Sequence, residues 1–260
     1  YNFEVNRMLK KQKLSLIVLT LLLLSVIGTL GFGQYLFRVL FSFLLLVVVI
    51  TFLPLLRQKI NYSYWLQVIL FGLPMLLPSF LFQTKEISFA VANLKIFVIF
   101  LLSLISLVVT LFLLHCKDYE MKLSSPILNL NIPKREAFLT VLTMLYSIFA
   151  EEMYFRFFIL GELQECNYYF KILVLIFSSF IFVSAHYLNR WATTMFTYRN
   201  YVSQFILSML SGNIFLMTGS LFYPLLLHIT YNLPEIFLIF KRLNYQQVHY
   251  DKDEPFFDDY

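Results

Sequence analysis

The stretch at residues 137–160, AFLTVLTMLYSIFAEEMYFRFFIL, is mostly apolar but carries two glutamates and an arginine. A helix of about 20 residues crosses roughly 30 Å of hydrocarbon, so this stretch is long enough to span a membrane. A charge at the centre of such a helix costs about 2.5–3.5 kcal/mol, so Glu151, Glu152 and Arg156 are expected to face the interior of a helix bundle. The alternative is that residues 137–150 form an interfacial helix too short to span, with the three charges in a solvated turn.

The composition of the whole chain is typical of a membrane protein. Of 260 residues, 60% are hydrophobic, 19% aromatic and 13% charged, and the mean hydropathy is +0.75. A soluble domain carries about 25% charged residues. The 30 Phe against 7 Gly and 8 Pro exclude collagen-like and disordered chains. Two cysteines, Cys116 and Cys166, predict no disulfide framework.

Apolar runs fill almost the whole chain and predict an all-α, polytopic membrane protein of about eight helices. Short connections between late runs indicate helical hairpins, and no alternation of period two suggests a barrel. The runs are 14–30, 35–56, 64–82, 89–114, 137–160, 169–188, 201–217 and 221–240.

The runs also predict the organisation of the chain. The first part is a cytoplasmic N-terminal segment and the second a membrane region of four helices. A cytoplasmic connection leads to the membrane region that carries the candidate site, and an acidic cytoplasmic tail follows. The corresponding boundaries are 1–13, 14–115, 116–135, 136–243 and 244–260.

Most Lys and Arg residues flank the runs on one side of the predicted bundle. Cytoplasmic flanks are enriched in these residues, so an even number of spans places both termini in the cytoplasm. The net charge of +5 therefore reflects orientation, and we expect no nucleic-acid partner. The richness in Phe, Ile, Asn, Tyr and Lys is typical of an AT-rich genome, which favours a bacterial plasma membrane.

The charged residues of the fifth run are predicted to have different roles. Glu152 and Arg156 are four positions apart, a spacing at which they can pair on one helix face and compensate each other's burial. Glu151 has no cation at such a spacing, which makes it the candidate general base.

Two of the histidines lie in or at the edge of late apolar runs. His186 stands near the end of the sixth run, and His228 stands in the eighth. His228 and Asn232 are four positions apart, so they project from one face, as two donors aimed at a single atom would. Either histidine alone is more often a packing residue, but their occurrence with buried glutamates favours a common site. His115 beside Cys116 could be half of a metal site, but no second ligand pair has a suitable spacing.

Elimination narrows the chemistry further. The chain contains no His-Glu-x-x-His zinc motif and no Gly-x-Ser-x-Gly nucleophile motif. The predicted spans contain no aspartate, which excludes a mechanism with two intramembrane aspartates. The remaining candidate chemistry is that of a glutamate acting together with a histidine.

Three motifs on successive late helices resemble the signature of the CPBP family of intramembrane endopeptidases. That family includes CAAX proteases and the bacteriocin-processing or immunity proteins also called Abi proteins. The motifs are Glu151-Glu152-x-x-x-Arg156, Phe182-x-x-x-His186 and His228-x-x-x-Asn232. The resemblance covers about residues 136–233, whereas the first four runs match only as hydrophobic helices.

The resemblance implies a glutamate-dependent intramembrane protease with no metal or other cofactor. The site residues that it implies are Glu151, Glu152, Arg156, His186, His228 and Asn232. The first glutamate and the first histidine would activate water, and the second histidine with the asparagine would stabilise the oxyanion. The pair of Glu152 and Arg156 would hold the helix in position. The implied partners are the lipid bilayer and a membrane-associated peptide or protein, of CAAX, bacteriocin or peptide-pheromone type.

Other functions stay open at this stage. One is a non-proteolytic immunity or scaffold protein that binds a bacteriocin or a partner membrane protein. Another is a transporter or channel, although no inverted repeat or pair of broken helices supports it. A zinc-dependent protease is a further alternative, because Glu151, His186 and His228 make a common ligand set.

Overall fold

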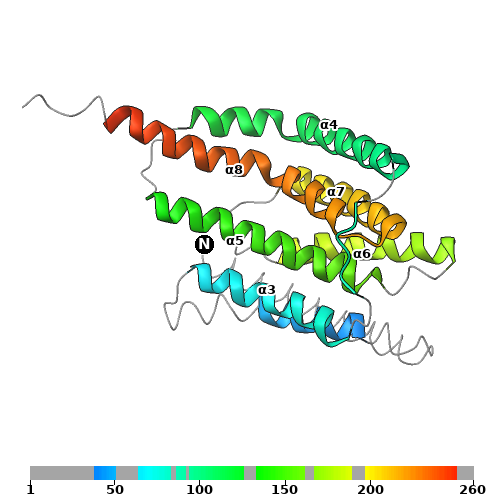
Figure 1. Ribbon diagram of the computed structural model, residues 1–260. Helices are drawn as coiled ribbons and strands as arrows, with labels where there is room; N and C mark the ends of the chain where they lie inside the picture. Colours follow the sequence, from blue (N-terminus) through cyan, green and yellow to red (C-terminus); the bar gives the residue numbers. More distant parts are fainter. Residues whose placement is uncertain are drawn as a thin grey trace, which may run out of the picture.

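The computed structural model describes residues 38–50, 64–82, 86–91, 94–125, 133–161, 167–188 and 197–250. The regular elements in these ranges are helices (Figure 1), and the one β contact among them is an isolated parallel bridge between Ser88 and Ser220. The predicted all-α class is therefore confirmed. The first predicted run, 14–30, lies outside the described residues.

The described helices follow the other predicted runs. They are Arg38–Ile50, α3 (Tyr64–Leu81), α4 (Leu94–Ser124), α5 (Lys134–Glu152), the π-helix η2 (Met153–Phe158), α6 (Tyr168–Leu188), α7 (Tyr198–Thr218) and α8 (Phe222–Tyr250). Helices α4 and α8 both continue past the ends of their apolar runs.

Four of these helices are long and apolar enough to cross a membrane. They are Leu94–Ser124, Lys134–Phe158, Tyr168–Leu188 and Tyr198–Thr218. Two shorter apolar helices, Arg38–Ile50 and Val68–Leu81, accompany them. The chain is an integral membrane protein, and the total of eight spans stays a prediction.

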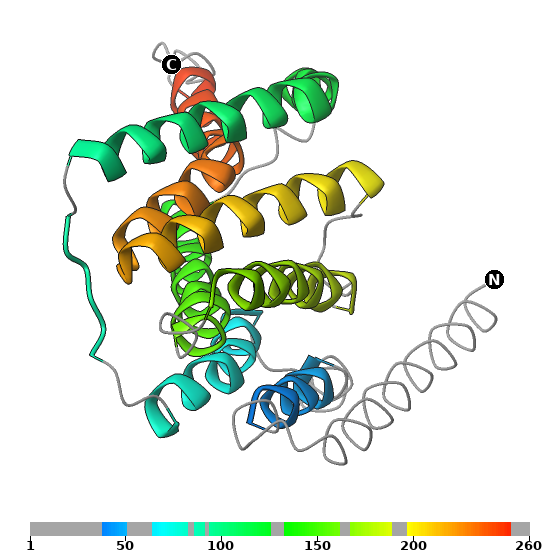
Figure 2. The same cartoon turned by 90° about the vertical axis from the view of Figure 1, so that its right-hand side faces the viewer.

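Helix α5 lies in the middle of the described bundle (Figure 2). It packs against α3 on one side and α8 on the other, and its continuation η2 reaches α3 and α7. Helix α7 in turn packs against α4, α6 and α8. The late helices therefore surround the end of α5, where the two glutamates stand.

The α7–α8 hairpin has clear local signals. Thr197 and Asn200 form a capping box at the start of α7. At its other end Gly219 has φ 67°, and its N–H donates to the Phe215 carbonyl at 2.7 Å. Glycine adopts this left-handed conformation readily because it has no Cβ. The chain then turns into α8, which places His228 beside α7.

A close approach joins α3 to α5. The Tyr146 hydroxyl donates to the Ile69 carbonyl at 3.0 Å. A Cβ atom added at Gly72 would lie 2.5 Å from Tyr146 Cε1, so the ring occupies the space that a side chain would need. This contact positions α5 against α3 less than two turns before the glutamates.

Candidate active site

The two glutamates end the α-helical part of α5, and a π-helix follows them at once. Residues Met153–Phe158 are π-helical, and the Ile159 N–H donates to the Tyr154 carbonyl at 3.0 Å, five residues back. π-Helical turns are rare and occur frequently at functional sites. The wider turn changes the direction of the side chains that follow Glu152, compared with a continuous α-helix.

Serines of neighbouring helices bond to the backbone of this π-helix. Ser79 of α3 donates to the Met153 carbonyl at 2.9 Å, and Ser178 of α6 donates to the Phe155 carbonyl at 3.4 Å. Both serines are buried. They provide donors for carbonyls in a segment where the α-helical ladder is interrupted, so tertiary contacts help to hold the irregular turn.

Glu152 contacts an arginine and a histidine in the interior. Its Oε2 lies 3.0 Å from Arg156 Nε, and its Oε1 lies 2.7 Å from His228 Nδ1. All three side chains are buried, with Glu152 and Arg156 at 0% exposure. The predicted Glu152–Arg156 pairing is confirmed, whereas the contact between Glu152 and His228 was not predicted.

Arg156 has a further contact across the bundle. Its guanidinium carbon lies 5.1 Å from the centroid of the Phe182 ring on α6. A guanidinium over an aromatic face is attracted by the ring quadrupole, an effect that is larger away from water. Phe182 is the first residue of the second motif, so this stacking links the first motif to the second.

Glu151 faces both histidines. Its Oε1 accepts a hydrogen bond from Ser147 Oγ at 3.1 Å. Its Oε2 lies 3.7 Å from His186 Nε2 and 3.6 Å from His228 Nε2. The Glu151 side chain is 9% exposed and that of His186 is 20% exposed, so the three groups meet in a largely buried part of the bundle that is still accessible at His186.

The other nitrogen of each imidazole is already engaged. His186 Nδ1 lies 3.0 Å from the Phe182 carbonyl, and His228 Nδ1 lies 2.7 Å from the Glu152 carboxylate. Both partners are acceptors, so each Nδ1 carries the hydrogen and donates it. Each Nε2 is therefore the nitrogen presented to Glu151, with the ring held from behind.

Asn232 is oriented differently from the other predicted site residues. Its Nδ2 donates to the His228 carbonyl, one turn earlier on α8, at 3.1 Å. The amide is thus bound to the backbone of its own helix. Its predicted oxyanion role stays a prediction.

Some members of the site were missed by the sequence reasoning. Ser147 stands four residues before Glu151, a spacing that could have identified it as a hydrogen-bond partner. Ser79 and Ser178 carry no comparable signal, because they contact the π-helix only through the packing of α3 and α6. The π-helix itself has no sequence signature that we recognise.

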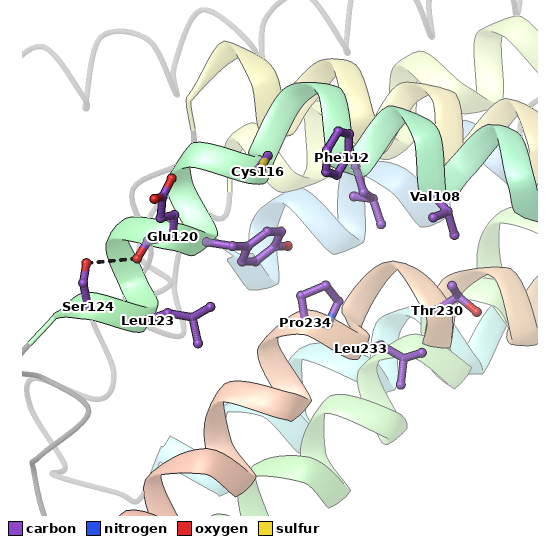
Figure 3. Close-up of a pocket in the computed structure, with 11 residues that line it drawn as sticks. Val108, Phe112, Cys116, Glu120, Leu123, Ser124, Thr230, Leu233 and Pro234 are labelled. Atoms are coloured by element: carbon purple, nitrogen blue, oxygen red, sulfur yellow. Dashed lines mark hydrogen bonds between the residues drawn. The ribbon is translucent and has the colours of Figure 1, made fainter.

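The described residues contain no group of three or more His, Cys, Asp or Glu arranged to hold a metal ion. A groove of about 830 Å³ lies elsewhere, between α4 and α8 (Figure 3). Val108 and Phe112 of α4 line it, facing Thr230 and Leu233 of α8. Thr230 is two positions from His228, so the groove and the glutamates lie on different faces of α8.

Comparison with known proteins gives one family match. Residues 133–234 match a family described as Type II CAAX prenyl endopeptidase Rce1-like. The predicted family resemblance is thereby confirmed. The matched segment contains every predicted site residue, and this family implies an intramembrane protease. No curated protein and no solved structure matches the chain.

Proposed function

We propose that this protein is a glutamate-dependent intramembrane endopeptidase that cleaves a membrane-associated peptide or protein. The observation that carries the proposal is the convergence of His186 Nε2 and His228 Nε2 on Glu151 Oε2, at 3.7 and 3.6 Å. These separations are longer than a direct hydrogen bond and suit a water bound to all three atoms. The CAAX-protease match of residues 133–234 supports the same reaction class.

Glu151 is the general base in this proposal. It takes a proton from the water while the water oxygen attacks the carbonyl carbon of the scissile peptide bond. The tetrahedral intermediate then collapses, the C–N bond breaks, and Glu151 returns the proton to the leaving amine. Ser147 holds the carboxylate through Oε1 and leaves Oε2 directed at the two imidazoles.

His228 is the proposed oxyanion donor. Its Nδ1 donates to the Glu152 carboxylate, and when Nε2 also carries a hydrogen it can donate to the oxyanion. Arg156 compensates the remaining charge of Glu152. Asn232 supplies the second donor if its amide turns from the His228 carbonyl toward the substrate. His186 holds the water.

The remaining proposals concern substrate and placement. The substrate is of CAAX type or of bacteriocin or peptide-pheromone type. The protein lies in a bacterial plasma membrane, with both termini in the cytoplasm. The distribution of Lys and Arg on the flanks of the helices supports this orientation.

The test compares the wild-type protein and two variants in proteoliposomes. Fluorogenic peptides, one farnesylated at a C-terminal CAAX sequence and one without a lipid, are incubated with the wild-type protein, Glu151→Gln and Glu120→Gln. Glu120 is an exposed glutamate on α4 and serves as the matched control. We expect cleavage by the wild type and the control and none by Glu151→Gln. Cleavage by Glu151→Gln at the wild-type rate would refute the glutamate mechanism and leave a non-proteolytic binding function.

A further inference from the structure

A second buried polar cluster joins α4, α7 and α8. His115 Nε2 lies 3.1 Å from Ser203 Oγ, and Ser203 Oγ lies 3.0 Å from the Tyr231 hydroxyl. His115 is 4% exposed and Ser203 is 0% exposed. The mechanism proposed above uses none of these three side chains, although buried polar groups are costly unless they are satisfied.

The Ser203 hydroxyl has a single hydrogen, and this determines which of the groups in contact with it must act as donors. Ser203 Oγ also lies 3.0 Å from the Asn200 carbonyl, which can only accept. A hydroxyl has one hydrogen and two lone pairs. When Ser203 donates to Asn200, His115 Nε2 and the Tyr231 hydroxyl must both donate to Ser203, and every contact is then satisfied.

The other ring nitrogen of His115 also faces an acceptor. His115 Nδ1 lies 3.4 Å from Asp118 Oδ2, and the same carboxylate lies 3.7 Å from Arg199 Nη1 of α7. The imidazole of His115 is therefore held between Ser203 at Nε2 and the Asp118 carboxylate at Nδ1.

The other titratable groups around His115 come from α4 and α8. The Tyr119 ring of α4 lies 6.1 Å from the His115 ring, centroid to centroid. Glu235 of α8 stands one turn beyond Tyr231 and forms an ion pair with Lys122 of α4. The carboxylate of Asp118 is thus the anion in direct contact with the imidazole among the described residues.

The sequence of contacts Ser203–His115–Asp118 has the order of a serine hydrolase triad, but it does not form a second active site. The Ser203 side chain has no exposed surface and its hydroxyl is engaged by its own helix. A substrate carbonyl has no access to it. The cluster is therefore a structural connection between helices.

Tyr231 connects this cluster to the catalytic groups. Its ring meets the His228 ring edge-on, with centroids 6.4 Å apart at an interplanar angle of 77°. Because Ser203 holds the hydroxyl, the ring is kept beside the imidazole whose orientation the proposed reaction needs.

We propose that His115 is a positioning residue which, through Ser203, holds Tyr231 beside His228. The inference rests on the proposed protease function. When the imidazole is removed, Ser203 loses the donor at His115 Nε2, and the bond between Ser203 and the Tyr231 hydroxyl is less well fixed.

The kinetic test is a double-mutant cycle on the peptide that the wild-type chain cleaves. Tyr231→Phe is expected to lower kcat about 3- to 10-fold, the effect of one hydrogen bond, with KM nearly unchanged. His115→Ala should lower kcat to a similar extent alone but have no further effect on Tyr231→Phe. Cys116→Ala, at the exposed neighbouring position, should match the wild type.

A conservative variant separates positioning from general damage. In His115→Gln the side-chain amide can still donate an N–H to Ser203. We expect a kcat near that of the wild type in this variant. A kcat as low as that of His115→Ala, or fully additive effects in the cycle, would overturn the proposal.

A second measurement does not depend on cleavage. In ¹⁵N-histidine NMR of the protein in detergent, with His115 assigned through His115→Gln, we expect a hydrogen on Nε2 of His115. The His228 resonances should shift in the same way in His115→Ala and in Tyr231→Phe. An Nε2 of His115 without a hydrogen, or unchanged His228 resonances in both variants, would refute the inference. Absence of cleavage by the wild type together with these shifts would refute the proposed function instead.

Discussion

Replacing Glu152 by glutamine is expected to destabilise the bundle far more than the same change at Glu151. Glu152 is 0% exposed, and its carboxylate contacts Arg156 at 3.0 Å and His228 at 2.7 Å. Glutamine keeps the size of the side chain but leaves the buried guanidinium without a counter-charge. Breaking a buried ion pair in this way costs about 3–5 kcal/mol.

This magnitude converts into a measurable shift in melting temperature. For a chain of this size 1 kcal/mol corresponds to about 2–4 °C, so Glu152→Gln should lower Tm by about 6–20 °C. Glu151 bonds to Ser147, and its Oε2 lies beyond direct hydrogen-bond distance from both imidazoles. Glu151→Gln should therefore shift Tm by less than about 3 °C while abolishing cleavage. Fluorescence-detected size-exclusion chromatography after heating in detergent measures both variants.

A double variant tests whether the uncompensated charge is the cause. Glu152→Gln with Arg156→Met removes both charges, and replacing a buried pair by groups of similar volume is often neutral. It should recover most of the stability lost in Glu152→Gln. The same Tm for Glu152→Gln and the wild type, or no recovery of Tm in the double variant, would contradict the role of the uncompensated charge.

Three further predictions concern the supports of the site and its independence of metal. Ser79→Ala removes the donor to the Met153 carbonyl in the π-helix, so we expect a loss of about 1–2 kcal/mol and a lower kcat. Ser79→Thr keeps the hydroxyl and should retain more of the stability and of kcat. Equal effects of Ser79→Ala and Ser79→Thr would contradict the supporting role of the Ser79 hydroxyl. Gly72→Ala places a Cβ 2.5 Å from the Tyr146 ring and should lower Tm measurably. If Tyr146→Ala does not relieve that loss in the double variant, the clash is not its cause. Incubation with EDTA should leave peptide cleavage unchanged, whereas a loss restored by Zn²⁺ would favour a metal site at Glu151.

The pairing of Glu152 with Arg156 could be predicted because it lies within a single helix. Residues four positions apart meet on one face whatever the helix packs against, so the sequence contains the contact. The same holds for the Ser147–Glu151 hydrogen bond, whose partners are also four positions apart. The order of the three motifs likewise indicated the family resemblance, which the match of residues 133–234 bears out.

The contact between Glu152 and His228 could not be predicted in the same way. The two residues are 76 positions apart, and their meeting depends on how α8 packs against α5. The π-helix also depends on long-range contacts, since Ser79 reaches the Met153 carbonyl from 74 positions away. Local spacing carries no information about either contact.

Sequence alone thus determined that this is an all-α membrane protein with charges buried in its fifth predicted helix, because hydrophobic length and the cost of burying charge are properties of each segment. Tertiary structure alone decided which imidazole nitrogen faces which carboxylate, and that His115 is linked through Ser203 to Tyr231. Those arrangements depend on the relative position and rotation of packed helices. Side chains from several helices fix these jointly, and no single segment specifies them.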